Sequence, residues 1–316
     1  MSAARPARAV VFAYHDVGVR CLRTLLAHGV EVPLVLSHGD ATGEIIWYDS
    51  VVRHARWHGL RVITPEDPNA PAVLAQVAAA QPDFLFSFYY RLMLGAALLA
   101  LPRRGAYNMH GSLLPKYRGR APVNWAVLYG ERETGATLHA MTLQPDAGDI
   151  VAQQAVPILP DDTAVEVFRK VTVAAELTLH GALPALLAGS AVHVPQDLSA
   201  GSYHGRRSPR DGAIDWRRGA RAAHDLIRAV APPYPGAFCR AKGLRLSIAR
   251  SLLGPVALRA ASPELRCEEG AVYACCADGS VRLLEFTLGD RVRSVEAFQL
   301  QYGTRALPLD PVWEET

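Results

Sequence analysis

Two side chains suited to acyl-transfer chemistry stand two positions apart in the stretch 107–125, which reads YNMHGSLLPKYRGRAPVNW. The amide of Asn108 carries hydrogen-bond donors, and the imidazole of His110 can take up and release a proton near neutral pH. A carbonyl that becomes tetrahedral needs a donor aimed at its oxygen, and an attacking amine needs a base for its proton. Alternate residues of a strand point to the same side, so both groups can face one reacting atom. The pair is therefore a minimal set for acyl transfer.

A carboxylate would complete this set, because it would fix the imidazole tautomer and favour its charged form. Asp146, in the turn PDAG, is the best-placed acidic residue, since we expect its hairpin to adjoin the same sheet end. The chain has no G-x-S-x-G motif, which favours direct attack by the acceptor over a covalent acyl-enzyme. Spacing alone leaves a purely structural role open for Asn108 and His110. It also leaves open that the cations Lys116, Arg118 and Arg120 belong only to a solvated loop.

Apolar and helical segments alternate through the first part of the chain. The apolar runs predict strands at 9–14, 32–37, 61–64, 84–90 and 106–110. Helical spacing predicts helices at 19–29, 51–60 and 71–81. This alternation predicts a doubly wound, Rossmann-like, mostly parallel sheet with helices on both faces. Ligands of such sheets bind beyond the carboxyl ends of the strands, where Asn108 and His110 would lie.

The usual dinucleotide fingerprint is missing from this sheet. The turn after the first strand, HDVGVR, carries one glycine and not the G-x-G-x-x-G that lets a pyrophosphate approach a helix. Two further runs of alternating residues, 135–142 and 149–158, predict an antiparallel pair added to the sheet. A long helix should follow, with Thr163 and Glu166 as its capping box and Pro184 kinking or ending it.

The amino-acid composition changes after this helix. Residues 196–216 are polar and rich in glycine, as in a segment that crosses between domains. Short strand-like pieces with regular turns begin near residue 237 and predict a small β-barrel of OB-like type. We therefore expect a catalytic domain over 1–205 and a C-terminal β-barrel domain over 206–316.

The composition fits a globular chain. The protein has 316 residues, of which 50% are hydrophobic and 20% charged, and its net charge of +3 is small for a dedicated nucleic-acid binder. The five cysteines lack metal-ligand spacing, which favours free thiols in a reducing cytoplasm and predicts no metal site. No signal peptide is recognisable, and no apolar run approaches the roughly 18 residues that a membrane helix needs. We expect a cytoplasmic protein without a membrane partner.

The stretch at 108–119 resembles the N-x-H-x-S-L-L-P-x-x-R-G segment of the 10-formyltetrahydrofolate-dependent formyltransferases. The chain has NMHGSLLPKYRG there, and its DAG turn matches the family's D-x-G. The resemblance implies that Asn108 stabilises the oxyanion. It implies that His110 accepts the amine proton and passes it to the leaving folate nitrogen, and that Asp146 favours the charged form of His110.

Within that family, the runs from residue 10 to about residue 240 most resemble the formyltransferase domain of a bifunctional enzyme of UDP-4-amino-4-deoxy-L-arabinose metabolism. The resemblance implies 10-formyltetrahydrofolate as co-substrate, that sugar's 4-amine as acceptor, and a place in lipid A modification and polymyxin resistance. It also implies a folate pocket. The pocket would use backbone at Leu92, Met93 and Leu94, with Arg120 and the run Thr142, Leu143, Gln144, Pro145 and Asp146.

Several alternatives stay open. The bifunctional enzyme continues into a decarboxylase domain that this chain does not carry, so the acceptor can be another nucleotide-linked amino sugar. Initiator methionyl-tRNA formylation uses the same trio. The basic run from Arg206 and Arg207 onward can hold tRNA, grip a diphosphate, or be a surface loop. A hydrolase that directs water at the formyl group and a folate-binding sensor without turnover are two further possibilities.

Overall fold

The computed structural model describes residues 5–40, 43, 45–289, 292, 294–303 and 305–310. The chain divides into two compact units, which are described separately. The first comprises Met1–Pro122, Glu133–Pro157 and Arg169–Gly205. The second comprises Val123–Arg132, Ile158–Phe168 and Arg206–Thr316.

The first unit is built on a seven-stranded sheet with the order β3-β2-β1-β4-β5-β7-β8. Its strands are β1 (Arg8–Ala13), β2 (Glu31–Leu36), β3 (Val62–Ile63), β4 (Phe84–Phe88), β5 (Ala106–His110), β7 (Glu133–Ala140) and β8 (Ile150–Pro157). The first five are parallel, and β7 and β8 extend the sheet antiparallel to them. The predicted doubly wound sheet with an antiparallel pair at one edge is confirmed.

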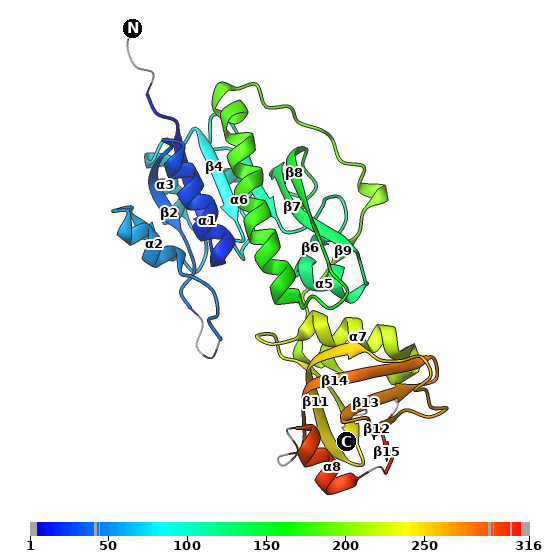
Figure 1. The fold of residues 1–316 in the computed structure, drawn as a ribbon. Coiled ribbons are helices and arrows are strands. Elements are labelled where there is room, and N and C mark those ends of the chain that lie inside the picture. The colour runs from blue at the N-terminus through cyan, green and yellow to red at the C-terminus, as the bar shows by residue number, and fades with distance from the viewer. Residues whose placement is uncertain are drawn as a thin grey trace. The chain divides into compact units, whose positions relative to one another are not determined.

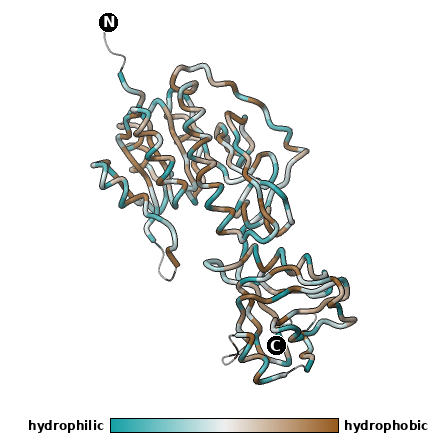
Figure 2. The backbone as a smooth tube through the Cα atoms, viewed as in Figure 1, coloured by the Kyte–Doolittle hydropathy of each residue, from teal (hydrophilic) through white to brown (hydrophobic). Residues whose placement is uncertain are grey.

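Helices connect the parallel strands. They are α1 (His15–Ala27), α2 (Val51–Trp57), α3 (Pro71–Ala79) and α4 (Ala96–Leu99). The long helix α6 (Ala164–Ala188) lies beside α1, where Arg20 contacts Glu176 at 3.2 Å (Figure 1). The central strands β1 and β4 are apolar runs that are buried almost throughout, as expected where both faces of a sheet are covered. Figure 2 shows hydrophobic residues along much of the chain that forms this unit. One core cluster gathers buried residues of β1, β2, β4, α3 and α4, among them Phe12, Leu36, Leu85 and Leu98.

Helix α6 contains a proline that does not end it. The helix continues past Pro184 to Ala188, so of the two predicted effects of this proline, a kink or an end, the end does not occur. The side chain of Arg104 donates to the carbonyls of Leu186 and Leu187 at 2.7 Å each, which stabilises the last turn beyond the proline.

Helix α6 is also long and apolar enough to cross a membrane, by length and composition alone. The expectation that no segment approaches such a length is therefore wrong. Half of its most apolar window is buried. Val171, Leu179 and Leu183 are fully buried, whereas Val173 and Leu177 are exposed. Burial along one side only is typical of a helix that packs on a protein core.

The second unit contains a six-stranded antiparallel sheet with the order β10-β11-β14-β13-β12-β15. Its strands are β10 (Ala237–Ala241), β11 (Leu244–Leu253), β12 (Glu264–Glu268), β13 (Ala271–Cys276), β14 (Gly279–Leu288) and β15 (Leu307–Pro308). A bridge between Ala241 and Leu309 links the two edges, so the sheet is nearly closed. The predicted C-terminal barrel is confirmed, and α7 (Gly219–Val230) and α8 (Val295–Tyr302) contribute to its core.

The first unit also contains a separate two-stranded sheet, formed by β6 and β9. β6 (Arg118–Gly119) pairs in parallel with β9 (Tyr203–His204), which lies in the segment predicted to be a crossing loop. This pairing joins the loop after β5 to residues more than eighty positions later. No sequence pattern predicts this pairing, because each of the two strands has only two residues.

Candidate active site

Asn108 and His110 occupy the carboxyl-terminal half of β5, on the strand beside β4. Asp146 lies in the turn between β7 and β8 and has a left-handed backbone conformation, with φ of 53°. Its Oδ1 atom is 3.5 Å from Nδ2 of Asn108 and 3.5 Å from Nδ1 of His110. The structure therefore brings these three polar groups together, although about forty residues separate them along the chain.

The carboxylate of Asp146 is held in its charged form. Burial on its own would raise the pKa of Asp146, but the neighbouring His110 and His139 and the N–H of Gly119 hold that pKa well below its usual range. The Gly119 N–H donates to Oδ2 at 2.9 Å. Oδ1 is left facing the two histidines at ion-pair distance, so the carboxylate acts on them through its charge.

The ring of His110 has one fixed nitrogen and one that faces the site. Its Nε2–H donates to the backbone carbonyl of Tyr117 at 2.8 Å, and the side chain is buried. Nδ1 points to Asp146 and carries the lone pair in this tautomer. A proton taken up at Nδ1 would give an imidazolium whose two N–H groups face a carbonyl and a carboxylate.

His139 is a member of the cluster that the sequence did not reveal; its strand pattern favoured a packing or surface role. The register of β5 against β7 sets it directly opposite Asn108, so both side chains share a face. Nδ1 of His139 donates to the carbonyl of Ala140 at 2.8 Å, which leaves Nε2 to accept from Asn108 Nδ2 at 3.1 Å. One N–H of the Asn108 amide is thus held by His139, and the other makes only the long 3.5 Å contact to Asp146 Oδ1, which a substrate oxygen can replace.

The residues predicted to bind folate fall into three positions around this cluster. Leu92 and Met93 are exposed in the loop after β4, whereas the side chain of Leu94 is buried in the core. Arg120 donates to the carbonyl of Arg91 at 3.3 Å, which joins it to the same loop. The run 142–145 leads directly into Asp146, with Thr142 Oγ1 donating to the carbonyl of Gln144 at 2.8 Å. The folate role of all these residues stays a prediction.

Two further residues at the strand ends have strained backbones. His15 follows β1 with φ of 66°, and Tyr89 follows β4 with φ of 58°. Their ring centroids are 6.5 Å apart, and the His15 ring stacks on Tyr48 at 3.8 Å. Strain of this kind gathers at functional sites, and the β1–β4 junction is where the strand order of the sheet reverses. The sequence identified His15 only as a position that can line the site.

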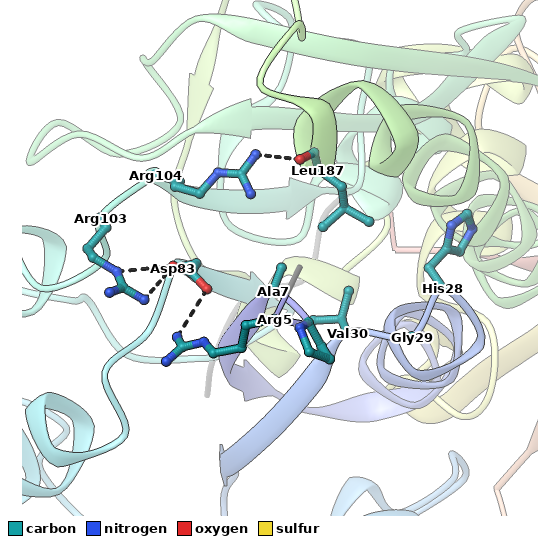
Figure 3. Close-up of a pocket in the computed structure, with 10 residues that line it drawn as sticks. Arg5, Ala7, His28, Gly29, Val30, Asp83, Arg103, Arg104 and Leu187 are labelled. Carbon is teal, nitrogen blue, oxygen red and sulfur yellow. Dashed lines mark hydrogen bonds and ion pairs between the residues drawn. The ribbon is translucent and has the colours of Figure 1, made fainter. Parts of the chain in front are cut away.

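A cavity of about 670 Å³ lies away from this cluster, at the edge where the parallel strands begin (Figure 3). Its cations already have partners within the protein. Asp83 accepts from Arg103 at 2.6 Å and contacts Arg5 at 3.6 Å. Arg104 donates to the end of α6, as described above. None of the three clustered groups lines this cavity, so it is not the candidate active site.

Within the described ranges, no group of three or more His, Cys, Asp or Glu residues is arranged to hold a metal ion. The five cysteines are buried free thiols. The cluster itself offers an amide donor, an imidazole base and a charged carboxylate.

Comparison with known families matches both parts of the chain. Residues 39–183 match the model for formyl transferase, and residues 207–300 match the model for the formyl transferase C-terminal domain. The two matches cover the candidate site and most of the barrel.

Solved structures with the same fold include three sugar-modifying enzymes. An N-formyltransferase from Helicobacter canadensis, in complex with folinic acid and dTDP-3-aminofucose, is 19% identical with a TM-score of 0.68, covering 88% of this chain and 99% of that one. WlaRD, a sugar 3N-formyl transferase in the presence of dTDP and 5-N-formyl-THF, is 18% identical with a TM-score of 0.72, covering 92% and 100%. A sugar N-formyltransferase from a Shewanella species is 18% identical with a TM-score of 0.62, covering 78% and 99%.

Proposed function

The chain belongs to the formyl transferase family through both of its matched domains, and from this premise we propose that it transfers a formyl group from 10-formyltetrahydrofolate to the amine of a nucleotide-linked sugar. The observation that carries the proposal is that the side chains of Asn108 and His110 both approach Oδ1 of Asp146. Further support comes from the solved relatives, which were determined with formyl-folates and with a dTDP-sugar or dTDP.

In the proposed reaction each of the three groups has one task. The acceptor amine attacks the formyl carbon, forming a C–N bond, and the developing oxyanion accepts from the Asn108 N–H that otherwise makes the long contact to Asp146. His110 takes the amine proton at Nδ1, and the resulting imidazolium lies between Tyr117 and the charge of Asp146. The bond from the formyl carbon to N10 of the folate then breaks, and His110 returns the proton to that nitrogen. Atoms and charge balance without a covalent enzyme intermediate.

The folate pocket of this proposal consists of backbone at Leu92, Met93 and Leu94, with Arg120 and the run 142–146. Leu92, Met93 and Leu94 belong to the loop after β4, and the run 142–146 belongs to the turn between β7 and β8. Residues 1–205 form the catalytic domain in this proposal and residues 206–316 the barrel domain.

The finer proposal is that the acceptor is UDP-4-amino-4-deoxy-L-arabinose and that the enzyme acts in the cytoplasm in lipid A modification, which confers polymyxin resistance. It rests on the sequence runs described above. An activity panel tests it: 10-formyltetrahydrofolate is offered with several UDP- and dTDP-linked amino sugars and with methionyl-tRNA. We expect formylation of the UDP-4-amino sugar at the highest kcat/KM. Preferred formylation of methionyl-tRNA, or formate release without any amine at a rate near that of transfer, would overturn the proposal.

The second unit carries a guanidinium suited to a diphosphate. Arg207 lies over the ring of Trp125, 4.8 Å from its centroid, and donates to the carbonyl of Asp211 at 3.0 Å. Its buried Nε and NH1 atoms have no hydrogen-bond partner among the described residues. Burial lowers the pKa of Arg207, and an anion would offset that cost. Arg206 beside it is exposed.

We therefore expect Arg207→Ala to raise the Kd for inorganic pyrophosphate on the order of tenfold or more, since a charge-assisted bidentate contact would be lost. Arg206→Ala is the matched control and should leave that Kd unchanged. Equal effects of the two substitutions would show that Arg207 does not hold a diphosphate.

A further inference from the structure

We propose that residues 196–204, here called the strap, position the catalytic histidine and aspartate by holding the loop that orients both. This inference rests on the proposed function, because it assigns the strap to the same catalytic groups. Two chains of hydrogen bonds carry it, one ending at His110 and one at Asp146.

The first chain runs through Ser202. Its Oγ accepts from the N–H of Tyr117 at 2.9 Å, and its carbonyl accepts from the N–H of Arg118 at 2.9 Å. The carbonyl of Tyr117, in turn, is the acceptor for Nε2–H of His110. Tyr117 has a left-handed backbone conformation, with φ of 58°, which an aromatic residue rarely adopts without being held. Ser202 therefore fixes the peptide that selects the tautomer of His110.

The second chain runs through Gly119 and Gln196. The carbonyl of His204 accepts from the N–H of Arg120 at 2.9 Å, which closes the β6–β9 pairing around Gly119. The Gly119 N–H is then aimed at Oδ2 of Asp146. From the other end of the strap, Gln196 Nε2 donates to the carbonyl of Asp146 at 3.1 Å and to that of Gly148 at 2.5 Å.

The strap thus bonds to the backbone of the loop and of the hairpin, in part through the side chains of Ser202 and Gln196. None of these hydrogen bonds joins a strap side chain to the His110 ring or the Asp146 carboxylate. Ser202 and Gln196 are the strap's positioning residues, and their loss should act on the rate of the chemical step more than on folate binding. A shift of about 1 Å in a catalytic group can cost on the order of 100-fold in rate.

The test compares Ser202→Ala with Ser202→Thr, which keeps the hydroxyl, and with Ser199→Ala as the matched control. Ser199 lies in the same segment, and its hydroxyl donates to Asp197. For each variant, kcat and the KM for 10-formyltetrahydrofolate are measured. The tautomer of His110 is read from 15N NMR of the imidazole nitrogens, with the signals assigned by their loss in His110→Ala.

We expect Ser202→Ala to lower kcat on the order of 10- to 100-fold, with the folate KM unchanged and the Nε2–H signal of His110 reduced in favour of Nδ1–H. Ser202→Thr and Ser199→Ala should match the wild type in all three readouts. If Ser202→Ala had the kcat and the His110 tautomer of the wild type, the inference that the strap positions His110 would be overturned. If Ser202→Ala does not fold, Gln196→Leu is tested in its place. A kcat of Gln196→Leu equal to that of the wild type would also overturn the inference.

His110→Ala separates the two proposals. An inactive His110→Ala with a normal Ser202→Ala means that the strap inference fails and the catalytic assignment stands. An active His110→Ala means that the catalytic assignment itself is wrong, whatever Ser202→Ala does.

Discussion

At the scale of single residues, the centre of the site is one oxygen atom. Oδ1 of Asp146 lies 3.5 Å from nitrogens of Asn108, His110 and His139. Each distance is longer than an ordinary N–H···O hydrogen bond, so the carboxylate acts mainly by its charge. Its second oxygen is fixed by the Gly119 N–H, which sets the orientation of the group.

We expect Asp146→Asn to lower kcat by about 100-fold or more, because the imidazolium formed at His110 loses its stabilising charge while the shape of the side chain is kept. Folate affinity should be retained. Asp149→Asn, three residues further along the same hairpin, removes an equal charge outside the cluster and serves as the control. Steady-state kinetics give kcat for both variants. Equal kcat values for Asp146→Asn and Asp149→Asn would exclude an electrostatic role for Asp146.

The lowered pKa of Asp146 also predicts a pH dependence of stability. A carboxyl group with a lowered folded-state pKa stabilises the protein above its unfolded pKa, about 3.9 for Asp, and this contribution is lost as the pH falls toward the folded value. The difference in Tm between the wild type and Asp146→Asn should therefore be constant from pH 7 to about pH 5 and shrink below about pH 4. Thermal unfolding at these pH values measures it. A difference that grew on acidification would contradict the lowered pKa.

At the scale of helices and strands, the sequence allowed most of the first sheet to be predicted. Buried parallel strands such as β1 and β4 are continuous apolar runs, and the loss of alternation distinguishes them from β8, which is half exposed. Asn108, His110 and Asp146 could be found because short local motifs contain them. His139 could not, because its place depends on the register between β5 and β7, which no local pattern encodes.

The β6–β9 pair was missed for a related reason. Two-residue strands carry no periodicity, and their pairing depends on close approach of two distant backbones. That approach needs Gly119, whose φ is 94° and whose position leaves no room for a side chain. A Cβ there would lie 2.3 Å from the carbonyl of His204.

We accordingly expect Gly119→Ala to separate β6 from β9 and to withdraw the N–H that holds Asp146. The measured result should be a kcat reduced on the order of tenfold or more, together with a lower Tm, since both a strained φ and a backbone clash are introduced. Gly205→Ala, one residue beyond β9, is the control because a Cβ at that glycine meets nothing within 4 Å. Comparable losses in the two variants would mean that the effect is not specific to the pairing.

At the scale of the whole molecule, the chain combines a mostly parallel sheet that carries the cluster with a separate, nearly closed antiparallel sheet. The change in amino-acid composition after residue 195 predicted that a second, barrel-like sheet would follow the first. It could not predict that Val123–Arg132 and Ile158–Phe168 belong to the second unit. Those segments are held there by long-range contacts, such as the hydrogen bond from Asn124 to the carbonyl of Ala229 at 2.7 Å, and such contacts leave no mark on local sequence.

The net charge of the chain bears on the class of acceptor. A protein that binds tRNA neutralises many phosphates and releases their counterions, so its affinity falls steeply with salt, by about a factor of 1,000 or more between 50 and 200 mM for 6–10 phosphate contacts on duplex DNA. A nucleotide-linked sugar offers two phosphates, and the chain has a net charge of +3. We expect the acceptor KM for the UDP-amino sugar to rise less than about tenfold over that range of salt. Kinetics at fixed folate concentration measure the slope, with the folate KM determined at each salt concentration as the control. A steep slope, together with turnover of methionyl-tRNA, would assign the basic run after residue 205 to tRNA and overturn the sugar acceptor.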